Sequence, residues 1–110
     1  MVEVRIRRDD RDRVASFSAS GHAGWAQSGD DVVCAAVSAV LQAAWLGLSE
    51  VAKIDVDARR ESGSLELAWP QTARGHAAVR AIAGTAALAV ERIATQYPDH
   101  VVVIREGGDG

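Results

Sequence analysis

Residues 31–52 of this 110-residue chain constrain its fold more than any other segment. They are predicted to form a helix whose apolar side chains cover nearly the whole circumference: Val32, Val33, Val37, Val40, Leu41, Trp45, Leu46 and Leu48. A helix that is apolar on most sides is buried on most sides. One small sheet and one further helix cannot cover it, so the segment predicts a dimer contact.

The other apolar residues repeat with the periods of strands and of one further helix. The expected strands are residues 2–7, 14–20, 54–60, 64–69 and 101–104. A second helix over residues 72–97 lies between Pro70 and Pro98, and Gly84 suggests close packing against the first helix. The order ββαββαβ predicts an α+β (mixed α/β) fold. We expect a dimeric two-layer sandwich of a small sheet and two helices, with one domain over residues 1–110.

Charge and cysteine content limit the classes of protein to which the chain can belong. The formal net charge is −3, and the arginines near the N-terminus alternate with acidic residues, which argues against nucleic acid as the main partner. The single cysteine excludes a disulfide within the chain and fits a reducing compartment. Residues 2–7 do not have the pattern of a signal peptide. We therefore expect a soluble, cytoplasmic protein.

Two further classes of site are not expected. The apolar stretch over residues 32–48 contains Cys34, Ser38, Gln42 and Gly47, so it is predicted to fall short of a membrane span. His76 and His100 lack partners at metal-ligand spacing. We expect no metal and no cofactor.

Cys34 is the candidate nucleophile. It follows a run of glycine, serine and aspartate that starts the first helix, with Asp30 or Asp31 as the expected N-cap. Unpaired N–H groups and the helix dipole favour a thiolate at such a place. His22 lies twelve residues upstream, at the end of a predicted strand, and an imidazole is the usual base for a thiol. The alternative is that Cys34 is a small buried hydrophobic residue.

The polar residues Asp31, Ser38 and Gln42 recur on the helix face of Cys34, and this polar stripe is predicted to form the floor of a cleft. Asp31 either caps the helix or orients His22, and a carboxylate beside a thiolate opposes its ionisation. Ser38 either binds the thiolate or donates to the carbonyl four residues back. Both alternatives remain open for each residue.

A glycine-containing loop joins the two candidate catalytic residues. It is bracketed by Gly21, Gly24 and Gly29, which permit tight turns and close approach to a ligand. An ordinary connection is the alternative to a mobile lid in which Trp25 covers the cleft.

The segments Gly-His-Ala at residues 21–23 and Asp-Val-Val-Cys-Ala-Ala-Val-Ser at residues 31–38 resemble the ribosomal-processing cysteine protease family. The resemblance implies a small bacterial homodimer that trims an N-terminal extension from large-subunit ribosomal protein twenty-seven. It also implies that His22, Asp31, Cys34 and Ser38 form the site. Trp25 departs from the family pattern, where a tyrosine is expected, and the tail over residues 105–110 matches no motif.

The sequence therefore predicts a cysteine endopeptidase in which His22 takes the proton of Cys34 and the thiolate attacks the scissile carbonyl. Backbone N–H groups at the helix start are the expected oxyanion hole, with that of Cys34 as a candidate. The rival hypotheses are a binding factor for ribosome assembly without enzymatic activity and a redox sensor that uses its single cysteine.

Overall fold

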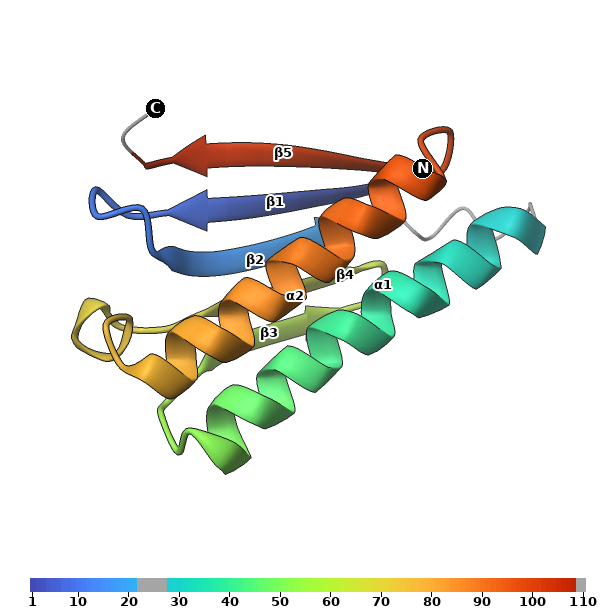
Figure 1. The fold of residues 1–110 in the computed structure, drawn as a ribbon. Helices are drawn as coiled ribbons and strands as arrows, with labels where there is room; N and C mark the ends of the chain where they lie inside the picture. Colours follow the sequence, from blue (N-terminus) through green and yellow to red (C-terminus); the bar gives the residue numbers. More distant parts are fainter. Residues whose placement is uncertain (22–27, 109–110) are drawn as a thin grey trace.

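The computed structural model describes residues 1–21 and 28–108, and of residues 28–31 it describes the backbone. The strands are β1 (Val2–Arg8), β2 (Val14–Ser20), β3 (Asp57–Glu61), β4 (Ser64–Ala68) and β5 (Val101–Gly107). The helices are α1 (Ser28–Leu46), its π-helical continuation η2 (Gly47–Val51), the short 3-10 turn η3 (Gln71–Ala73) and α2 (Ala77–Gln96). The predicted order ββαββαβ is confirmed (Figure 1).

The five strands form one mixed sheet in the order β3-β4-β2-β1-β5. All neighbours are antiparallel except β1 and β5, which run parallel with Val4 opposite Val103. The strand β3 therefore forms one edge of the sheet and β5 the other. The last strand returns to pair beside the first, which encloses β1 and β2 in the centre of the sheet.

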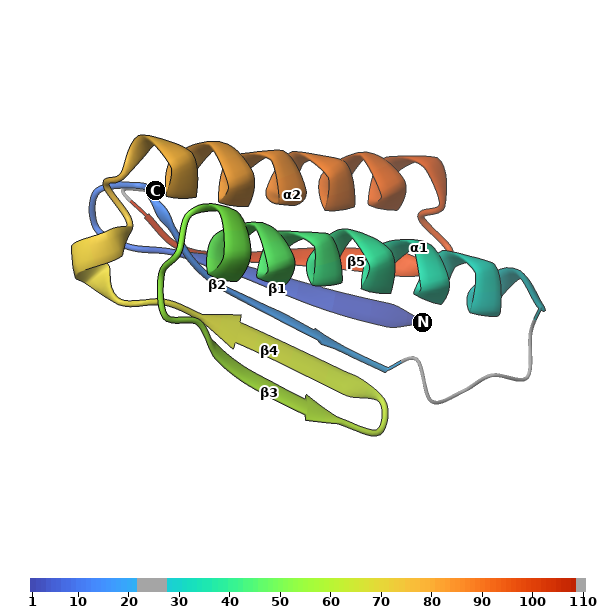
Figure 2. The same cartoon turned by 90° about the horizontal axis from the view of Figure 1, so that it is seen from below.

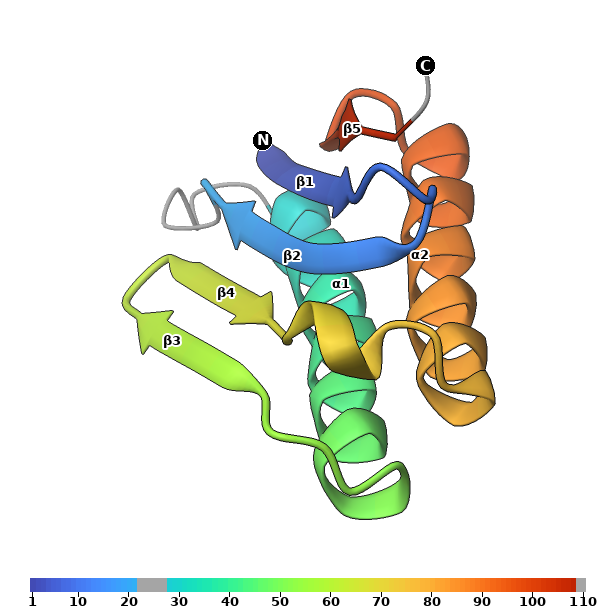
Figure 3. The ribbon, with the colours of Figure 1, turned by 90° about the vertical axis from the view of Figure 1, so that its left-hand side faces the viewer.

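Both long helices lie on the same face of the sheet, so the predicted two-layer arrangement is confirmed (Figures 2 and 3). The side chains of alternate strand residues point to the helices and are buried: Val2, Val4, Ile6, Ala15, Phe17, Ala19, Leu65 and Leu67. On α1 and η2 the buried residues recur at helical spacing: Val33, Val37, Leu41, Ala44 and Leu48. The core thus lies between one sheet face and one stripe of each helix.

The starts of three elements differ from the predicted starts by three residues or more. Helix α1 begins at Ser28, three residues before the predicted start, so neither Asp30 nor Asp31 is its N-cap and that prediction is wrong. Strand β3 begins at Asp57 rather than at residue 54. Helix α2 begins at Ala77 because residues 71–73 form a separate 3-10 turn and His76 is extended.

The close approach of the two helices does not use the predicted glycine. A Cβ atom added to Gly84 would meet no atom within 4 Å, whereas one added to Gly47 would lie 3.0 Å from Cγ2 of Ile82. Gly47 is therefore the residue that allows the end of α1 to pack against α2.

The segment Val32–Val51 has a mean hydropathy of 1.8, and by length and composition it is long and apolar enough to cross a membrane. The prediction that it falls short of a membrane span is therefore wrong on that criterion. In the structure the segment is a helix that packs on the sheet, and 33% of its window is buried inside the chain. The remaining residues of that window are half-buried or exposed on this single chain.

The carboxylate of Asp9, whose side chain is 8% exposed, joins the turn between β1 and β2 to the segment that precedes α2. Asp9 accepts hydrogen bonds from the backbone N–H groups of Arg11 (2.9 Å) and Arg13 (3.1 Å) and from Nε of Arg13 (3.1 Å). Nη1 of Arg74 lies 3.5 Å from the same carboxylate and its Nη2 donates to the carbonyl of Trp69 at 3.0 Å. Burial alone raises the pKa of Asp9, but the donors from Arg13 and Arg11 outweigh it and lower that pKa from 3.8 to about 2.

The lowered pKa of Asp9 predicts how stability depends on acid. Ionised Asp9 stabilises the fold fully above its unfolded pKa of 3.8, and this contribution is lost as the pH falls through its folded value of about 2. Asp9→Asn should lower the melting temperature at pH 7 and flatten the fall in stability across that acid window. Thermal denaturation followed by circular dichroism measures both effects. The exposed neighbour supplies the control, Asp10→Asn, and an equal response of the two variants would contradict the assignment.

Candidate active site

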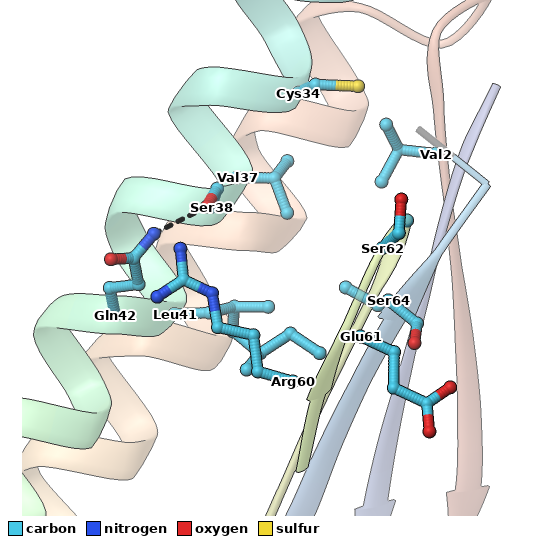
Figure 4. Close-up of a pocket in the computed structure, with 13 residues that line it drawn as sticks. Val2, Cys34, Val37, Ser38, Leu41, Gln42, Arg60, Glu61, Ser62 and Ser64 are labelled. Atoms are coloured by element: carbon cyan, nitrogen blue, oxygen red, sulfur yellow. Dashed lines mark hydrogen bonds between the residues drawn. The ribbon is translucent and has the colours of Figure 1, made fainter. Parts of the chain in front are cut away.

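The pocket that contains the cysteine lies between α1 and the hairpin formed by β3 and β4 (Figure 4). Its volume is about 450 Å³. One wall is the polar stripe of α1 with its apolar neighbours, and Val2 and Ala19 reach it from the two central strands. The opposite wall is the continuous segment of residues 60–65, which contains the hairpin turn. The predicted cleft along the polar stripe is therefore present.

Cys34 projects its sulfur from α1 into this space (Figure 4). Its residue is 8% exposed, which leaves the thiol at the border between core and pocket. Cys34 packs on the core, as expected for a small buried hydrophobic residue, and its sulfur faces the cleft, as expected for a nucleophile.

The early start of α1 places Cys34 in the second turn of the helix instead of the first. An α-helical residue donates its N–H to the carbonyl four residues earlier, so the N–H of Cys34 is engaged within the helix. The expected part of that N–H in an oxyanion hole is therefore not supported. The influence of the helix dipole also falls off beyond the first turn. The sequence predicted that the helix start favours the thiolate. With Cys34 in the second turn that contribution is smaller, and a nearby base becomes more important.

Ser38 follows Cys34 one turn along the helix and has a partner that the sequence did not predict. Nε2 of Gln42 donates to Oγ of Ser38 at 2.7 Å (Figure 4). A hydroxyl that accepts one hydrogen bond still has its own proton to donate. Gln42 thus restricts the rotation of the Ser38 hydroxyl and lines the pocket beside it. Its recurrence four residues after Ser38 was the signal for this role.

The hairpin wall is the part of the pocket that sequence reasoning missed. Arg60, Ser62 and Ser64 contribute a guanidinium and two hydroxyls to the side opposite Cys34. The turn at Glu61-Ser62-Gly63 was predicted, but its approach to α1 depends on how the sheet lies beneath the helix. Arg60 also carried a signal, since it occupies an alternate position of β3 on which an apolar residue is expected.

The remaining predicted site residues fall in three groups. His22, Gly24 and Trp25 lie outside the described residues, and so does the side chain of Asp31. Gly29 lies within α1, so its assignment to the loop is corrected. Gly21 directly follows β2 with φ of +92°, and a Cβ atom there would lie 2.5 Å from the carbonyl oxygen of Met1. Only glycine fits this position.

Comparison with known proteins adds to this geometry. The model of the family described as cysteine protease Prp matches residues 1–102. The ribosomal processing cysteine protease Prp of Bacillus subtilis (strain 168) is 44% identical over 41 residues. That aligned segment spans 37% of this chain and 37% of the length of the Bacillus protein.

Solved structures show the same fold over nearly the whole chain. A protein of Streptococcus mutans superposes with a TM-score of 0.88 and 22% identity, covering 97% of this chain and 95% of its own. The essential ribosomal processing protease Prp of S. aureus, in complex with a substrate peptide, has a TM-score of 0.87 and 21% identity. This match covers 96% of this chain and 100% of the S. aureus chain. The same S. aureus protease with a covalently linked product peptide gives a TM-score of 0.79 and 22% identity, covering 96% of this chain and 100% of its own.

Proposed function

The chain belongs to the family of the cysteine protease Prp, and on that premise we propose that it is a cysteine endopeptidase that acts on a ribosomal protein. The family is one of cysteine peptidases. The observation that carries the proposal is the position of Cys34, the single cysteine, whose sulfur faces a pocket of about 450 Å³. The pocket lies between α1 and the hairpin of β3 and β4, and a segment of peptide is its proposed occupant.

The proposed reaction uses Cys34 as nucleophile and His22 as base and acid. His22 takes the thiol proton, and Sγ of Cys34 attacks the carbonyl carbon of the scissile peptide bond. The tetrahedral intermediate collapses to a thioester, and His22 gives the proton to the leaving amine. Water then attacks the thioester, which releases the carboxylic acid product and restores the thiol. No metal or cofactor takes part in these steps.

Ser38 and Asp31 support this pair in the proposal. Held by Gln42, the Ser38 hydroxyl keeps a proton that it can donate to negative charge on the sulfur or on the substrate. Asp31 lies one turn before Cys34 in α1. It favours catalysis more by orienting His22 than by approaching the thiolate, since a second negative charge raises the pKa of a thiol.

The proposed substrate is the N-terminal extension of a large-subunit ribosomal protein. Its support is the name of the Bacillus relative, which specifies ribosomal processing, and the substrate peptide held by the S. aureus protease. Residues 21–23 and 31–38 resemble the ribosomal-processing cysteine protease family, and this resemblance narrows the proposed substrate to large-subunit ribosomal protein twenty-seven. We also propose a cytoplasmic location, because a reducing compartment keeps a single cysteine in its thiol form.

The cleavage prediction uses a peptide that spans the extension of the host's ribosomal protein twenty-seven. Cys34→Ala and His22→Ala should each lower kcat/KM at least about a thousandfold, because each removes a group from the reacting pair. Mass spectrometry measures the product and circular dichroism the fold. His76→Ala is the matched control for the histidine, since His76 is exposed and precedes α2 outside the pocket.

The outcomes separate the three hypotheses. Full cleavage by Cys34→Ala would contradict the mechanism. Tight binding of the peptide without cleavage by the unaltered chain would favour a ribosome-assembly factor. Reversible oxidation of Cys34 without any cleavage would favour a redox sensor.

The uncovered face of α1 supports a homodimer, which the family resemblance also implies. Large apolar side chains remain exposed on α1 and η2, including Val32 (70%), Leu46 (62%) and Val51 (74%). Beside them runs an apolar groove between the two helices, lined by Val40, Gly47, Ile82 and several alanines. A second copy of the chain is the proposed occupant, because an exposed apolar surface of this kind on a small domain marks an interface.

Light scattering tests the dimer at micromolar concentration. The chain has a mass of 11.6 kDa, and we expect a particle of about twice that mass. Leu46→Glu should shift the mass to that of one chain, because the new carboxylate would be buried in the contact. Gln96→Glu introduces the same side chain on the polar surface of α2 and should leave the dimer intact. A monomer formed by the unaltered chain would contradict the proposal.

A further inference from the structure

Arg60 is a charged residue on the inner face of an edge strand. In the antiparallel pairing of β3 with β4, Arg60 lies opposite Leu65 and Ala58 opposite Leu67. Directly opposite residues share a face of the sheet, and both leucines are buried on the side that carries the helices. Arg60 therefore points to the side of α1. The adjacent Arg59 lies opposite Glu66 and points to the other face.

The guanidinium of Arg60 enters the pocket that Cys34 lines. Figure 4 shows its side chain extending from β3 toward α1, with its end on the side of the pocket occupied by Ser38 and Gln42. Its neighbour Glu61 also lines the pocket, and in the same view its carboxylate points away from the end of the Arg60 side chain. Within residues 1–21 and 28–108, no hydrogen bond or ion pair engages the side chain of Arg60, whereas those of Arg13 and Arg74 contact Asp9. Its donors face the cleft.

We propose that Arg60 determines specificity by binding a carboxylate of the peptide substrate, an inference that rests on the proposed function. A guanidinium presents a planar set of donors that matches a carboxylate, with two parallel hydrogen bonds. The pairing of β3 with β4 fixes the backbone of Arg60 at the edge of the cleft, because Arg60 lies in a strand rather than in a loop.

The spacing along α1 fixes where in the peptide the carboxylate lies. Ser38 and Gln42 follow Cys34 by four and eight residues, which is about 6 and 12 Å along a helix. The proposed peptide runs along α1, and an extended peptide advances about 3.3 Å per residue. The acidic side chain therefore lies roughly two to four residues from the scissile bond. Peptides that carry glutamate at such a position are the preferred substrates.

An inward-pointing charge on an edge strand has a second explanation, because it prevents edge-to-edge pairing of sheets. That role does not distinguish a substrate with glutamate from one with glutamine. Discrimination between these two isosteric side chains is therefore the property that separates substrate recognition from protection of the edge.

The experiment measures binding and cleavage with one set of peptides. A fluorescent peptide spanning the cleavage junction of the host's ribosomal protein carries glutamate or glutamine in turn at positions two to four residues on either side of the scissile bond. Fluorescence anisotropy with Cys34→Ala gives the Kd of each peptide. At one position we expect glutamate to bind about tenfold more tightly than glutamine, with the advantage reduced at high salt.

Arg60→Gln in the same background should abolish the preference for glutamate. Arg59→Gln, the neighbouring change on the opposite face, should retain it. A set of peptides without any glutamate preference, or a preference that survives Arg60→Gln, would overturn the assignment of Arg60.

The active chain separates this inference from the proposed function. Cleavage of the peptides without a glutamate preference in KM would support the protease and refute the role of Arg60. An Arg60-dependent preference in binding, with no cleavage by the unaltered chain, would support Arg60 as a carboxylate-binding residue and refute the protease.

Discussion

The packing of α1 on the sheet determines where Cys34, Ser38 and Gln42 lie in the candidate site. The helix buries Val33, Val37 and Leu41 together with Ala44, and each larger side chain contributes about 1.5–3 kcal/mol on burial. Cys34, Ser38 and Gln42 each follow one of the first three by a single residue. A rotation of about 100° per residue turns this second stripe to the margin of the core. The apolar contact that stabilises the fold therefore also aims the sulfur into the pocket.

The same arrangement explains why the pocket needs the hairpin. A helix lying across a sheet leaves a cleft only where the sheet extends beyond it, and β3 and β4 supply that extension (Figure 3). Their turn brings Ser62 and Ser64 to the side opposite Cys34. Arg60 then supplies a positive charge on the helix-facing side of the edge strand β3, where an apolar residue is the usual occupant. The cleft thus combines a nucleophile on a rigid helix with a charged wall on a paired strand.

The sequence predicted the structure best in the segments whose hydrophobic periodicity determines their secondary structure. The alternation in residues 2–7 and 14–20 placed β1 and β2 to within one residue, and the stripe of Cys34, Ser38 and Gln42 was recognised from helical spacing. Element ends were less predictable. Strand β3 begins late because Lys53 adopts φ of 57° and the N–H of Ile54 bonds to the carbonyl of Leu48, which ties residue 54 to the end of the helix.

Local sequence patterns could not predict the contacts between segments that lie far apart in the chain. The approach of residues 60–65 to α1 depends on the sheet order, in which β4 pairs with β2 rather than with β5. The contact between Gln42 and Ser38 requires a side-chain rotamer that spacing alone does not specify. The start of α1 at Ser28 was missed because glycine and two aspartates favour a cap or loop when taken alone. This early start places Cys34 farther from the N-terminus of the helix than its motif indicated.

Covalent trapping tests most directly whether Cys34 is a nucleophile in a peptide-binding cleft. A chloromethyl ketone built on the extension sequence loses chloride to an attacking thiolate and leaves a thioether, which mass spectrometry of the intact chain and its tryptic peptides locates. The account predicts one adduct per chain, on Cys34, formed much faster with the matching sequence than with a scrambled one. No adduct, or equal rates with both sequences, would contradict it.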